Sequence, residues 1–557
     1  MASPSPPHSP SGVPQSRWNQ QLADKAEQLK PTLYRWSRPV QQVIRFEADE
    51  EKYFGIRALR TISSLKELEA SLWSRKADFI LDFGIHMVGY LSMRLSSHGA
   101  YMDAPCRLRL TFGESPLDVT MGMDNVKTWI STSWLPDEIV NVDMCPSTLK
   151  LPRRQSFRYL RVEIIDMSDK CKIAFSDISC ECVSAINPAD TIEAISFKST
   201  TLNHIDHVSL MTLRDCMQTV FEDGPRRDRR LWLGDLRLQA LANYKTFKDF
   251  DLVKRCIYQF AAIVRDDDSI PACLFEHTTF SASADYIVDY DALFTAVVYD
   301  YVEASGDISL GEELWPIVLG CLKQSLSHLH PETFVFDVSR GDTWKFLDWQ
   351  PALDRNAGSH GVLLYCLKTA NKLARLLGKE PRHEETVSRM TKGAEVFLSV
   401  DGLFVSGPEA QVSFASAAWL ALSGAFPQEK AKAALLKSLD HPGAIRPLTP
   451  YLWHYVCEAL AEVGCVDECL KIMEEYWGKM IEAGADTFWE CFDPKDKTSS
   501  PYGDVRNNSF CHAWSCTPTY LLRGRLLNAV TDGSTSMVTS MGDLDDVWVA
   551  HTKSAFE

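Results

Sequence analysis

The spacing of apolar residues changes once along the chain, and this change constrains the fold more than any other feature. From about Val43 to Ala185, apolar residues recur at every second position, the period of strands with one buried face. After Pro188 the period becomes helical and stays helical to about residue 525. A chain of 557 residues also exceeds one ordinary core. The sequence therefore predicts a multidomain protein with a β-rich region followed by an all-α region.

The first region contains several alternating segments. Residues 107–112 read Arg-Leu-Arg-Leu-Thr-Phe, and residues 160–164 place Leu, Val and Ile on one face. Several such strands with one solvated face predict an antiparallel β-sandwich over residues 43–186. Because no clear aromatic platform stands out, we interpret this domain as a brace for its neighbour rather than as a sugar-binding module.

The second region, residues 190–526, contains about twelve apolar-periodic runs. Short and long connections alternate, as expected of helix hairpins whose longer loops gather at one end. Twelve helices in six hairpins predict an (α/α)6 toroid. An α-solenoid is the alternative, but no repeat of about 34 to 45 residues is visible. The runs lie near residues 203–221, 232–246, 248–266, 285–304, 309–328, 356–378, 383–399, 413–424, 427–439, 450–464, 466–482 and 511–524.

The two ends of the chain differ from both regions. Residues 1–30 are rich in Ser and Pro, and we expect a disordered leader without the apolar segment of a secretion signal. Residues 527–557 are expected to form a short tail, in which Val547–Val549 are compatible with a docked strand. No apolar run is long enough to span a bilayer, so we expect a cytoplasmic protein with no membrane partner.

Charge and cysteine content exclude several classes of partner. A net charge of -16 argues against nucleic acid, which requires clustered Lys and Arg. The sixteen cysteines are expected to be thiols in a reducing compartment. Cys180 and Cys182 lack the paired spacing of a zinc site, so no metal and no cofactor is expected. The sequence predicts nothing about the oligomeric state.

A short segment between two helical runs, Asp223–Asp235, is crowded with charge. It holds three aspartates, four arginines, a tryptophan and two glycines. Carboxylates can transfer protons, arginines favour the ionised form of some carboxylates, and an indole can pack on the apolar face of a sugar. This combination favours a sugar-cleaving pocket. A surface salt-bridge cluster that caps a helix is the alternative interpretation.

A second acidic centre follows far along the chain, where Glu490 comes directly after Phe488 and Trp489 in a long loop. Glycoside hydrolysis requires two carboxyl groups on either side of the scissile bond. In a closed ring of hairpins the first and last helices are neighbours, so we expect Glu490 to face Asp228. A solvated loop carboxylate is the alternative for Glu490.

Aromatic residues occupy the other long loops. Asp348 and Trp349 end an aromatic stretch, and His512 and Trp514 precede the last helical run. Exposed indoles are costly unless they stack on a ligand or become buried, so these loops favour a ligand site. His512 can donate to a sugar hydroxyl, although a satisfied core histidine is an equal alternative.

Four motifs, in this order, resemble the six-hairpin α-L-rhamnosidases of glycoside hydrolase family 78 over residues 45–525. The first resembles the acidic signature of that family, which ends in the same Trp-x-Gly-Asp. The third resembles the stretch that carries the family's base. The motifs are Asp223–Asp235, Thr449–Tyr455, Thr487–Glu490 and Cys511–Ser515.

The resemblance implies an inverting hydrolase that removes a terminal α-L-rhamnosyl unit from small rhamnosides. It implies that Asp228 is the general acid and Glu490 the general base. The family signature has Glu at the acid position, and Asp228 is one methylene shorter; we expect the backbone to compensate. The implied substrate-binding residues are Asp223 and Asp235, which would also tune the acid, together with Arg227, Trp232, Asp348, Trp349, Trp489, His512 and Trp514.

Two other functions remain compatible with the same residues. A lyase acting on uronic acids would need a Tyr or His near the C5 proton and basic residues for the uronate, for which Arg226–Arg230 are the concentrated candidates. A catalytically impaired sugar-binding protein is favoured by the shorter Asp228 and disfavoured by the presence of Glu490.

Overall fold

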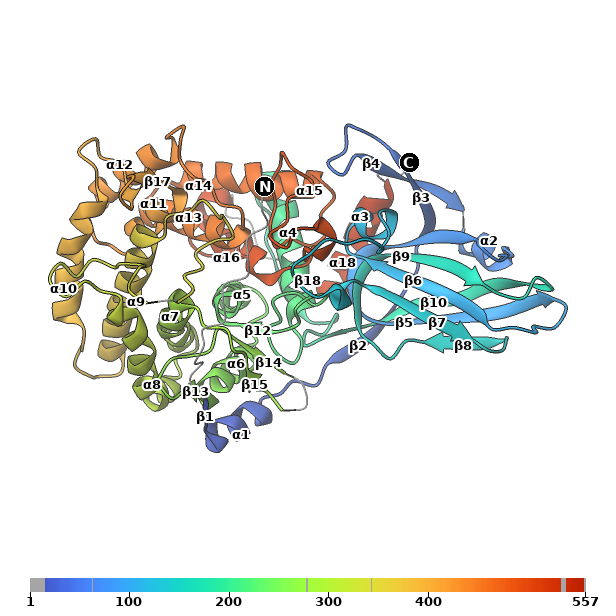
Figure 1. Cartoon of the computed structure of the whole chain (residues 1–557), viewed down its shortest axis with the longest axis horizontal. Helices are drawn as coiled ribbons and strands as arrows, with labels where there is room; N and C mark the ends of the chain where they lie inside the picture. Colours follow the sequence, from blue (N-terminus) through green and yellow to red (C-terminus); the bar gives the residue numbers. More distant parts are fainter. Residues whose placement is uncertain (1–15, 63, 277–278, 342, 532–536, 555–557) are drawn as a thin grey trace.

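The computed structural model describes residues 16–554 except 63, 277–278, 342 and 532–536. A sheet-rich region lies at one end of the long axis and a helical region at the other (Figure 1). The order of the two regions along the chain is the predicted one, and they contact each other over the middle of the molecule.

The sheet-rich region consists of nine strands in one hydrogen-bonded network, and every pairing in it is antiparallel, as predicted. Two short helices, α2 (Leu65–Ala70) and α3 (Pro116–Thr120), interrupt it. The strands are β2 (Tyr34–Pro39), β3 (Gln42–Ala48), β4 (Ile56–Ile62), β5 (Asp78–Gly99), β6 (Cys106–Gly113), β7 (Asp137–Val142), β8 (Ser147–Lys150), β9 (Gln155–Asp166) and β10 (Cys171–Ser184).

The alternation seen in the sequence explains the register of β6 and β9. Leu108 pairs with Ile164, and Leu110 pairs with Val162, across the two antiparallel strands. All four side chains are fully buried. Because side chains in a strand alternate between faces, the register that joins these two apolar sets is strongly favoured.

Each of the twelve predicted helical runs contains a helix. The run 466–482 is interrupted by a π-helical segment, Glu474–Gly478. The helices are α4 (Thr200–Cys216), α5 (Leu233–Lys245), α6 (Phe250–Ala262), α7 (Val288–Ser305), α8 (Ile308–Ser327), α9 (Asn356–Leu376), α10 (Glu384–Gly393), α11 (Phe414–Leu422), α12 (Gln428–Leu439), α13 (Pro450–Glu462), α14 (Val466–Met473), α15 (Lys479–Glu482), α16 (Pro518–Arg523) and α17 (Leu527–Val530).

Several helix starts are fixed by side chains that satisfy a free backbone N–H group. Asp249 accepts a hydrogen bond from the N–H of Leu252 at the start of α6, and Thr449 does the same for Leu452 in α13. Pro450 then occupies the first position of α13, where its missing N–H costs nothing.

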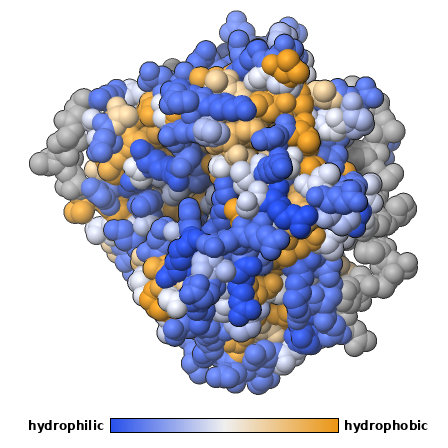
Figure 2. All heavy atoms as spheres, turned by 90° about the vertical axis from the view of Figure 1, so that its left-hand side faces the viewer, coloured by the Kyte–Doolittle hydropathy of each residue, from blue (hydrophilic) through white to orange (hydrophobic). Residues whose placement is uncertain are grey.

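The outer helices turn polar faces outward. The buried residues of α12 are Ala431, Ala434, Leu435 and Ser438, a helical spacing that leaves the opposite face to its charged residues. Figure 2 shows hydrophilic side chains over much of the end formed by the helical region, with hydrophobic side chains between them. No helix of the described residues is long and apolar enough to cross a bilayer.

Short strands join distant segments of the helical region. β12 (Leu231–Trp232) precedes α5 and pairs with β14 (Cys273–Phe275), and the other short strands form pairs of their own. These are β1 (Ser16–Trp18) with β13 (Ile263–Arg265), β11 (Thr191–Ala194) with β18 (Met537–Ser540), β14 with β15 (Ser281–Ala282), and β16 (Val405–Ser406) with β17 (Gln411–Val412).

The structure corrects the prediction of a disordered leader over residues 1–30. Residues 1–15 lie outside the described residues, but β1 and helix α1 (Gln20–Gln28) follow them. The side chain of Asn19 caps α1, and Leu22 is buried against the helical region, where α1 contacts α6. Apolar residues at helical spacing therefore order this part despite its polar composition.

The tail prediction is also wrong at Val547–Val549, which lie in helix α18 (Met541–Ser554) rather than in a strand. Met541, Asp545, Trp548 and Val549 are buried. Their spacing is that of one face of a helix, and this face packs on β5.

Candidate active site

A small cavity, about 360 Å³ including open solvent, lies between the loop before α5, the starts of α5 and α7, and three later loops. The cavity is lined by Asp223, Arg227, Asp228, Trp232, Asp235, Ile287, Tyr290, Trp344, Phe346, Trp349, Glu490, Tyr502, His512 and Trp514.

The loop that carries Asp228 is held by Asp223. One Asp223 carboxylate oxygen accepts the N–H of Asp228 at 3.2 Å, and the other accepts the N–H of Arg230 at 3.0 Å. A side chain at Gly224 would lie 2.5 Å from the carbonyl oxygen of Arg227, so only glycine fits there. The sequence of this loop therefore fixes the backbone from which Asp228 projects.

Arg227 connects the two predicted catalytic carboxylates. One terminal nitrogen donates to Asp228 Oδ1 at 3.1 Å, and the other donates to Glu490 Oε2 at 2.6 Å. Its Nε donates to the carbonyl oxygen of Asn507 at 2.9 Å, and its guanidinium lies 4.1 Å from the ring centre of Tyr502. The planar fork of a buried arginine thus sets the relative position of two acids from distant parts of the chain.

Glu490 is held by several hydrogen bonds. Its Oε1 accepts from the hydroxyl of Tyr502, and its Oε2 accepts from the N–H of Ser509 at 3.2 Å as well as from Arg227. The backbone carbonyl of Glu490 accepts from the indole N–H of Trp514 at 3.0 Å. The side chain is therefore restrained on both oxygens and at its backbone.

Burial raises the pKa of two further acids. The pKa of Asp223 is raised to about 7, mainly by burial and then by the negative charge of Asp228. The pKa of Asp235 is also raised, chiefly by burial, although His512 opposes the shift. For His512, burial lowers the pKa, but Asp235 and the charge of Glu490 outweigh it and raise the pKa to about 9. The site therefore holds an imidazolium among several acids at neutral pH.

Several polar atoms in the cavity wall have no hydrogen-bond partner among the described residues. They include the indole nitrogen of Trp349 and both ring nitrogens of His512, although His512 Nε2 forms an ion pair with Asp235 Oδ1 at 3.1 Å. Buried polar atoms are normally hydrogen-bonded. Together with aromatic walls, these free donors fit a ligand that carries hydroxyl groups on an apolar ring.

Two predicted site residues lie outside the lining. The carboxylate of Asp348 accepts the N–H groups of Leu448 at 2.9 Å and Thr449 at 3.0 Å, so it ties its loop to the start of α13. Trp489 packs against Phe54 of the sheet-rich region, with 5.5 Å between ring centres. Since neighbouring residues of an extended chain point to opposite sides, Trp489 points away where Glu490 points in.

The structure also adds residues that sequence reasoning missed. Tyr502 is the tyrosine of the long loop before α16, and nothing in its local sequence marks it as a partner of Glu490. Trp344 and Phe346 belong to the same aromatic stretch as Trp349, which was a usable signal. Tyr290, in the first turn of α7, had no such signal in the sequence.

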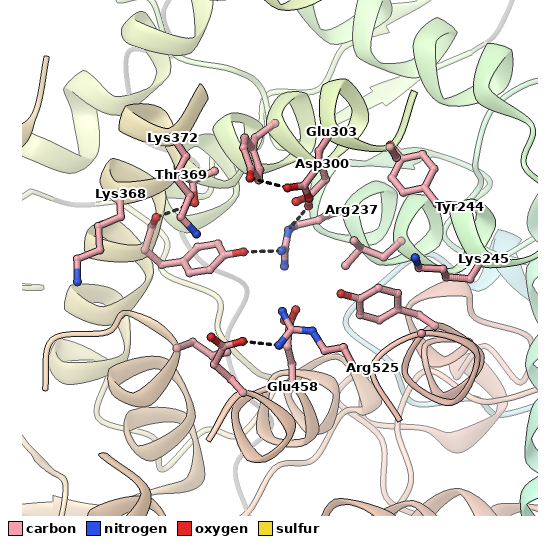
Figure 3. A pocket seen from close by; sticks show the side chains of 18 of the residues that line it. Arg237, Tyr244, Lys245, Asp300, Glu303, Lys368, Thr369, Lys372, Glu458 and Arg525 are labelled. Carbon is pink, nitrogen blue, oxygen red and sulfur yellow. Dashed lines mark hydrogen bonds and ion pairs between the residues drawn. The ribbon is translucent and has the colours of Figure 1, made fainter. Parts of the chain in front are cut away.

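A second and larger cavity, about 2100 Å³ including open solvent, lies at the opposite ends of the same helices. Figure 3 shows Arg237 projecting into it from α5, paired with Asp300 at 3.1 Å. Arg237 also donates to the hydroxyl of Tyr365 at 2.9 Å, and Arg525 pairs with Glu462. These charges satisfy one another, so we place the chemistry in the smaller cavity despite the difference in size.

One cluster has ligand atoms at metal-binding distances. Atoms of His86, Asp215 and Cys511 all lie within 4.8 Å of one another. His86 Nδ1 already lies 2.7 Å from Asp215 Oδ2, and Nε2 lies 2.9 Å from Ser156 Oγ. Burial lowers the pKa of His86, but Cys511 and the Asp215 carboxylate outweigh it and raise the pKa. Both ring nitrogens of His86 thus already have partners, so this cluster fits an ion pair between the two regions better.

Comparisons with known proteins assign both regions. Residues 40–182 match the N-terminal domain of glycosyl hydrolase family 78 α-rhamnosidases, and residues 191–525 match the bacterial α-L-rhamnosidase six-hairpin glycosidase domain. No relative among curated proteins matches the chain.

Solved structures agree with this assignment. A rhamnosidase from Klebsiella oxytoca with rhamnose bound is 37% identical, has a TM-score of 0.87, and is matched over 91% of this chain and 99% of its own. A family 78 rhamnosidase of Bacillus sp. GL1, 19% identical, has a TM-score of 0.68 over 85% of this chain and 50% of its own. A Streptomyces avermitilis α-L-rhamnosidase complexed with L-rhamnose, 17% identical, has a TM-score of 0.63 over 89% and 44%. The last two show the shared fold alone. This chain is therefore a glycoside hydrolase that belongs to the α-L-rhamnosidases of family 78.

Proposed function

We propose that the protein releases terminal α-L-rhamnose from small rhamnosides, with Asp228 as general acid and Glu490 as general base. The observation that carries this proposal is the Arg227 bridge, which joins Asp228 and Glu490 across one small cavity. The Klebsiella relative, matched over nearly its whole length, was solved with rhamnose bound, which supports the sugar.

The geometry supports different roles for the two acids. Both oxygens of Glu490 are fixed by hydrogen bonds, which suits a base that must orient a water molecule. Asp228 is held to Arg227 through Oδ1, while its Oδ2 lies 3.5 Å from Arg230 and its side chain is more exposed than that of Glu490. An acid must reach the leaving oxygen at the cavity mouth, which suits Asp228.

Inversion is proposed from the resemblance to family 78, and the same bridge is compatible with it. Because the terminal nitrogens of a planar guanidinium are about 2.3 Å apart, the bridged oxygens of Asp228 and Glu490 lie within about 8 Å of each other. This upper bound admits the separation of about 6.5–9.5 Å found in inverting glycosidases and also that of about 5–5.5 Å found in retaining ones, so the product decides between them. Proton NMR of the first-formed sugar tests this directly: we expect β-L-rhamnose first, and α-L-rhamnose first would contradict inversion.

The roles predict different leaving-group dependence for two variants. p-Nitrophenolate leaves without full protonation, so Asp228→Asn should lose little activity on the p-nitrophenyl rhamnoside and about 10²–10⁴-fold on methyl α-L-rhamnoside. Glu490→Gln should lose about 10²–10⁴-fold on both. Initial rates of rhamnose release measure this, with Glu303→Gln in the larger cavity as control.

Other outcomes favour the alternatives. Rhamnose binding without turnover in the unmodified protein would favour a sugar-binding protein. Formation of an unsaturated uronate from a uronic-acid glycoside would favour a lyase. Equal activity of all variants would remove both residues from the mechanism.

We also propose the finer architecture that this mechanism needs. The helix contacts run from α5 to α7, α9, α11 and α13, and α16 contacts α5, which supports closure of six hairpins into an (α/α)6 toroid. The strand pairings support a sandwich whose layers share β5, in the orders β4-β3-β5-β9-β6-β7 and β8-β5-β10-β2. A reducing compartment such as the cytoplasm is supported by the sixteen cysteines, all free thiols.

A further inference from the structure

Trp129 is an exposed indole on the loop between α3 and β7 of the sheet-rich region. Among the described tryptophans, Trp129 (36%) and Trp18 (44%) are the ones more than a third exposed. An indole has a large apolar area, and burying this area against a partner stabilises the complex, so an exposed indole marks a candidate contact site. Trp18 packs against Phe280 near the start of the chain, whereas Trp129 reaches the helical region.

The loop of Trp129 is attached to the segment that carries Tyr502. Its indole N–H donates to the carbonyl oxygen of Pro501 at 2.9 Å, and the hydroxyl of Thr128 donates to the backbone carbonyl oxygen of Tyr502 at 2.9 Å. The rings of Trp129 and Tyr502 are 5.7 Å apart between centres, and Tyr502 is 5.9 Å from Trp349. A row of three rings therefore runs from the cavity wall to the surface.

The chemistry directs the substrate along this row. With the terminal sugar in the cavity, as the proposed function requires, the group attached to its anomeric carbon lies beside the proton donor Asp228, which lines the cavity. Asp228 is bonded to Arg227, and Arg227 stacks on Tyr502. Tyr502 lies beside this reacting centre, because it stacks on the Arg227 that bridges both acids and its hydroxyl donates to Glu490. The next ring outward is that of Trp129.

We propose that Trp129 is the platform on which an aromatic aglycone of the substrate stacks, which makes the sheet-rich region a part of the substrate site. This inference rests on the proposed rhamnosidase activity. In this proposal Trp129 contacts the aglycone, and the cavity binds the rhamnosyl unit. Stacking between aromatic rings is worth an affinity change of about threefold to tenfold.

Kinetics with two substrates and one product test the proposal. Trp129→Ala should lower kcat/KM for p-nitrophenyl α-L-rhamnoside about threefold to tenfold, mainly through KM. The kcat/KM for methyl α-L-rhamnoside and the inhibition constant of L-rhamnose should stay unchanged. Trp129→Phe should retain most of the aryl preference, and Trp18→Ala is the matched exposed-tryptophan control.

The remaining outcomes overturn the proposal in distinguishable ways. Equal losses on both substrates, with weaker rhamnose inhibition, would show that Trp129 only supports Tyr502. Unchanged kinetics would show that the aglycone leaves elsewhere. If Trp129→Ala unfolds, as judged by its melting temperature, an unchanged aryl preference in Trp129→Phe, Trp129→Tyr and Trp129→Leu alike would overturn it. An unmodified protein inactive on both rhamnosides would overturn the proposed function itself.

Discussion

Asp223 shows how one buried side chain can serve structure and electrostatics together. It accepts two backbone N–H groups of the loop that positions Asp228, and it lines the cavity. Ionisation of Asp223 costs free energy, because its carboxylate is buried and lies near the carboxylate of Asp228. Beside its predicted role of holding the sugar, Asp223 therefore has a structural role, that of holding the loop of Asp228.

This arrangement predicts a specific pH dependence of stability. The pKa of Asp223 is about 7 in the folded protein against an ordinary value of 3.8, because of burial and the charge of Asp228. The folded protein thus binds this proton more tightly than the unfolded chain. The contribution of Asp223 is fully present below about pH 4 and is lost as the pH rises through about 7.

The variant Asp223→Asn removes this titration. At every pH the variant loses one hydrogen-bond acceptor, which costs about 1 kcal/mol of stability. The unmodified protein loses stability as the pH rises from 4 to 8, so the unfolding free energy of the variant minus that of the unmodified protein should increase over this range. Urea unfolding across this range measures the difference. The exposed Asp143→Asn should keep the unmodified pH profile, and parallel profiles for Asp223→Asn would contradict the assignment.

At the level of elements, the loops that carry Asp228 and Glu490 are positioned from both regions. Asp118, at the short helix α3, accepts from Arg226 at 2.9 Å, and Glu114 accepts the N–H of Phe510 at 2.8 Å. Arg226 lies in the loop of Asp228, and Phe510 lies beside the Ser509 that binds Glu490. The sheet-rich region therefore braces both halves of the site, and through Trp129 we propose that it also contacts substrate.

The start of α5 depends on close packing at Gly234. A Cβ atom there would lie 2.3 Å from Cζ of Tyr290 in α7, which cannot move freely because it is buried. Gly234→Ala should therefore push apart the helix starts that present Trp232 and Asp235. We expect a loss of about 1–3 kcal/mol in stability and of about a hundredfold in kcat/KM.

Rhamnoside hydrolysis and thermal melting of the same preparation measure both effects. Gly443→Ala, in an exposed loop, should change neither. A fully active Gly234→Ala would show that the helix starts tolerate displacement.

The sequence predicted the helices well because amphipathic spacing is a local signal. It predicted less where backbone partners come from elsewhere in the chain. Residues 511–517 were expected to open the last helix, but the N–H of His512 bonds to Phe488 and that of Ala513 bonds to Asp223. α16 accordingly begins only at Pro518. Tyr502 escaped prediction for the same reason, since its role exists only once Glu490 is beside it.

At the scale of the whole molecule, charge is distributed along the helix axes. The ends of α5 and α7 that face the small cavity carry Asp235, Asp289 and Asp291 in their first turns. At the opposite ends, which line the larger cavity, α5 carries Lys245 in its last turn, whereas α7 carries Glu303 and no basic residue (Figure 3). Helix dipoles favour anions at N-termini and cations at C-termini by about 0.3–1 kcal/mol each. The acids at both N-termini and Lys245 therefore fit the helix dipoles, whereas Glu303 does not.

The last helix ties the two regions together, whereas the sequence predicted only a short tail compatible with a docked strand at Val547–Val549. Asp545 of α18 is nearly fully buried and accepts from Arg214 of α4 and from Arg38 of β2, each at 2.6 Å. Without Asp545, Arg214 would keep Asp215 as its one acidic partner among the described residues, and Arg38 would keep the exposed Asp546. Loss of a partner from a buried ion pair is destabilising.

The pair of contacts from Asp545 to Arg214 and Arg38, here called the clamp, can be tested against the neighbouring residue Asp546. Asp546 also accepts from Arg38, at 2.7 Å, but its side chain is 74% exposed. We expect Asp545→Ala to cost about 3–5 kcal/mol, because two arginines lose a buried partner. Asp546→Ala should cost less than about 1 kcal/mol, since solvent screens an exposed pair. Urea unfolding followed by tryptophan fluorescence measures both, and equal costs would contradict the clamp. Because Asp545 bonds one residue from each region, its loss should also separate one cooperative transition into two.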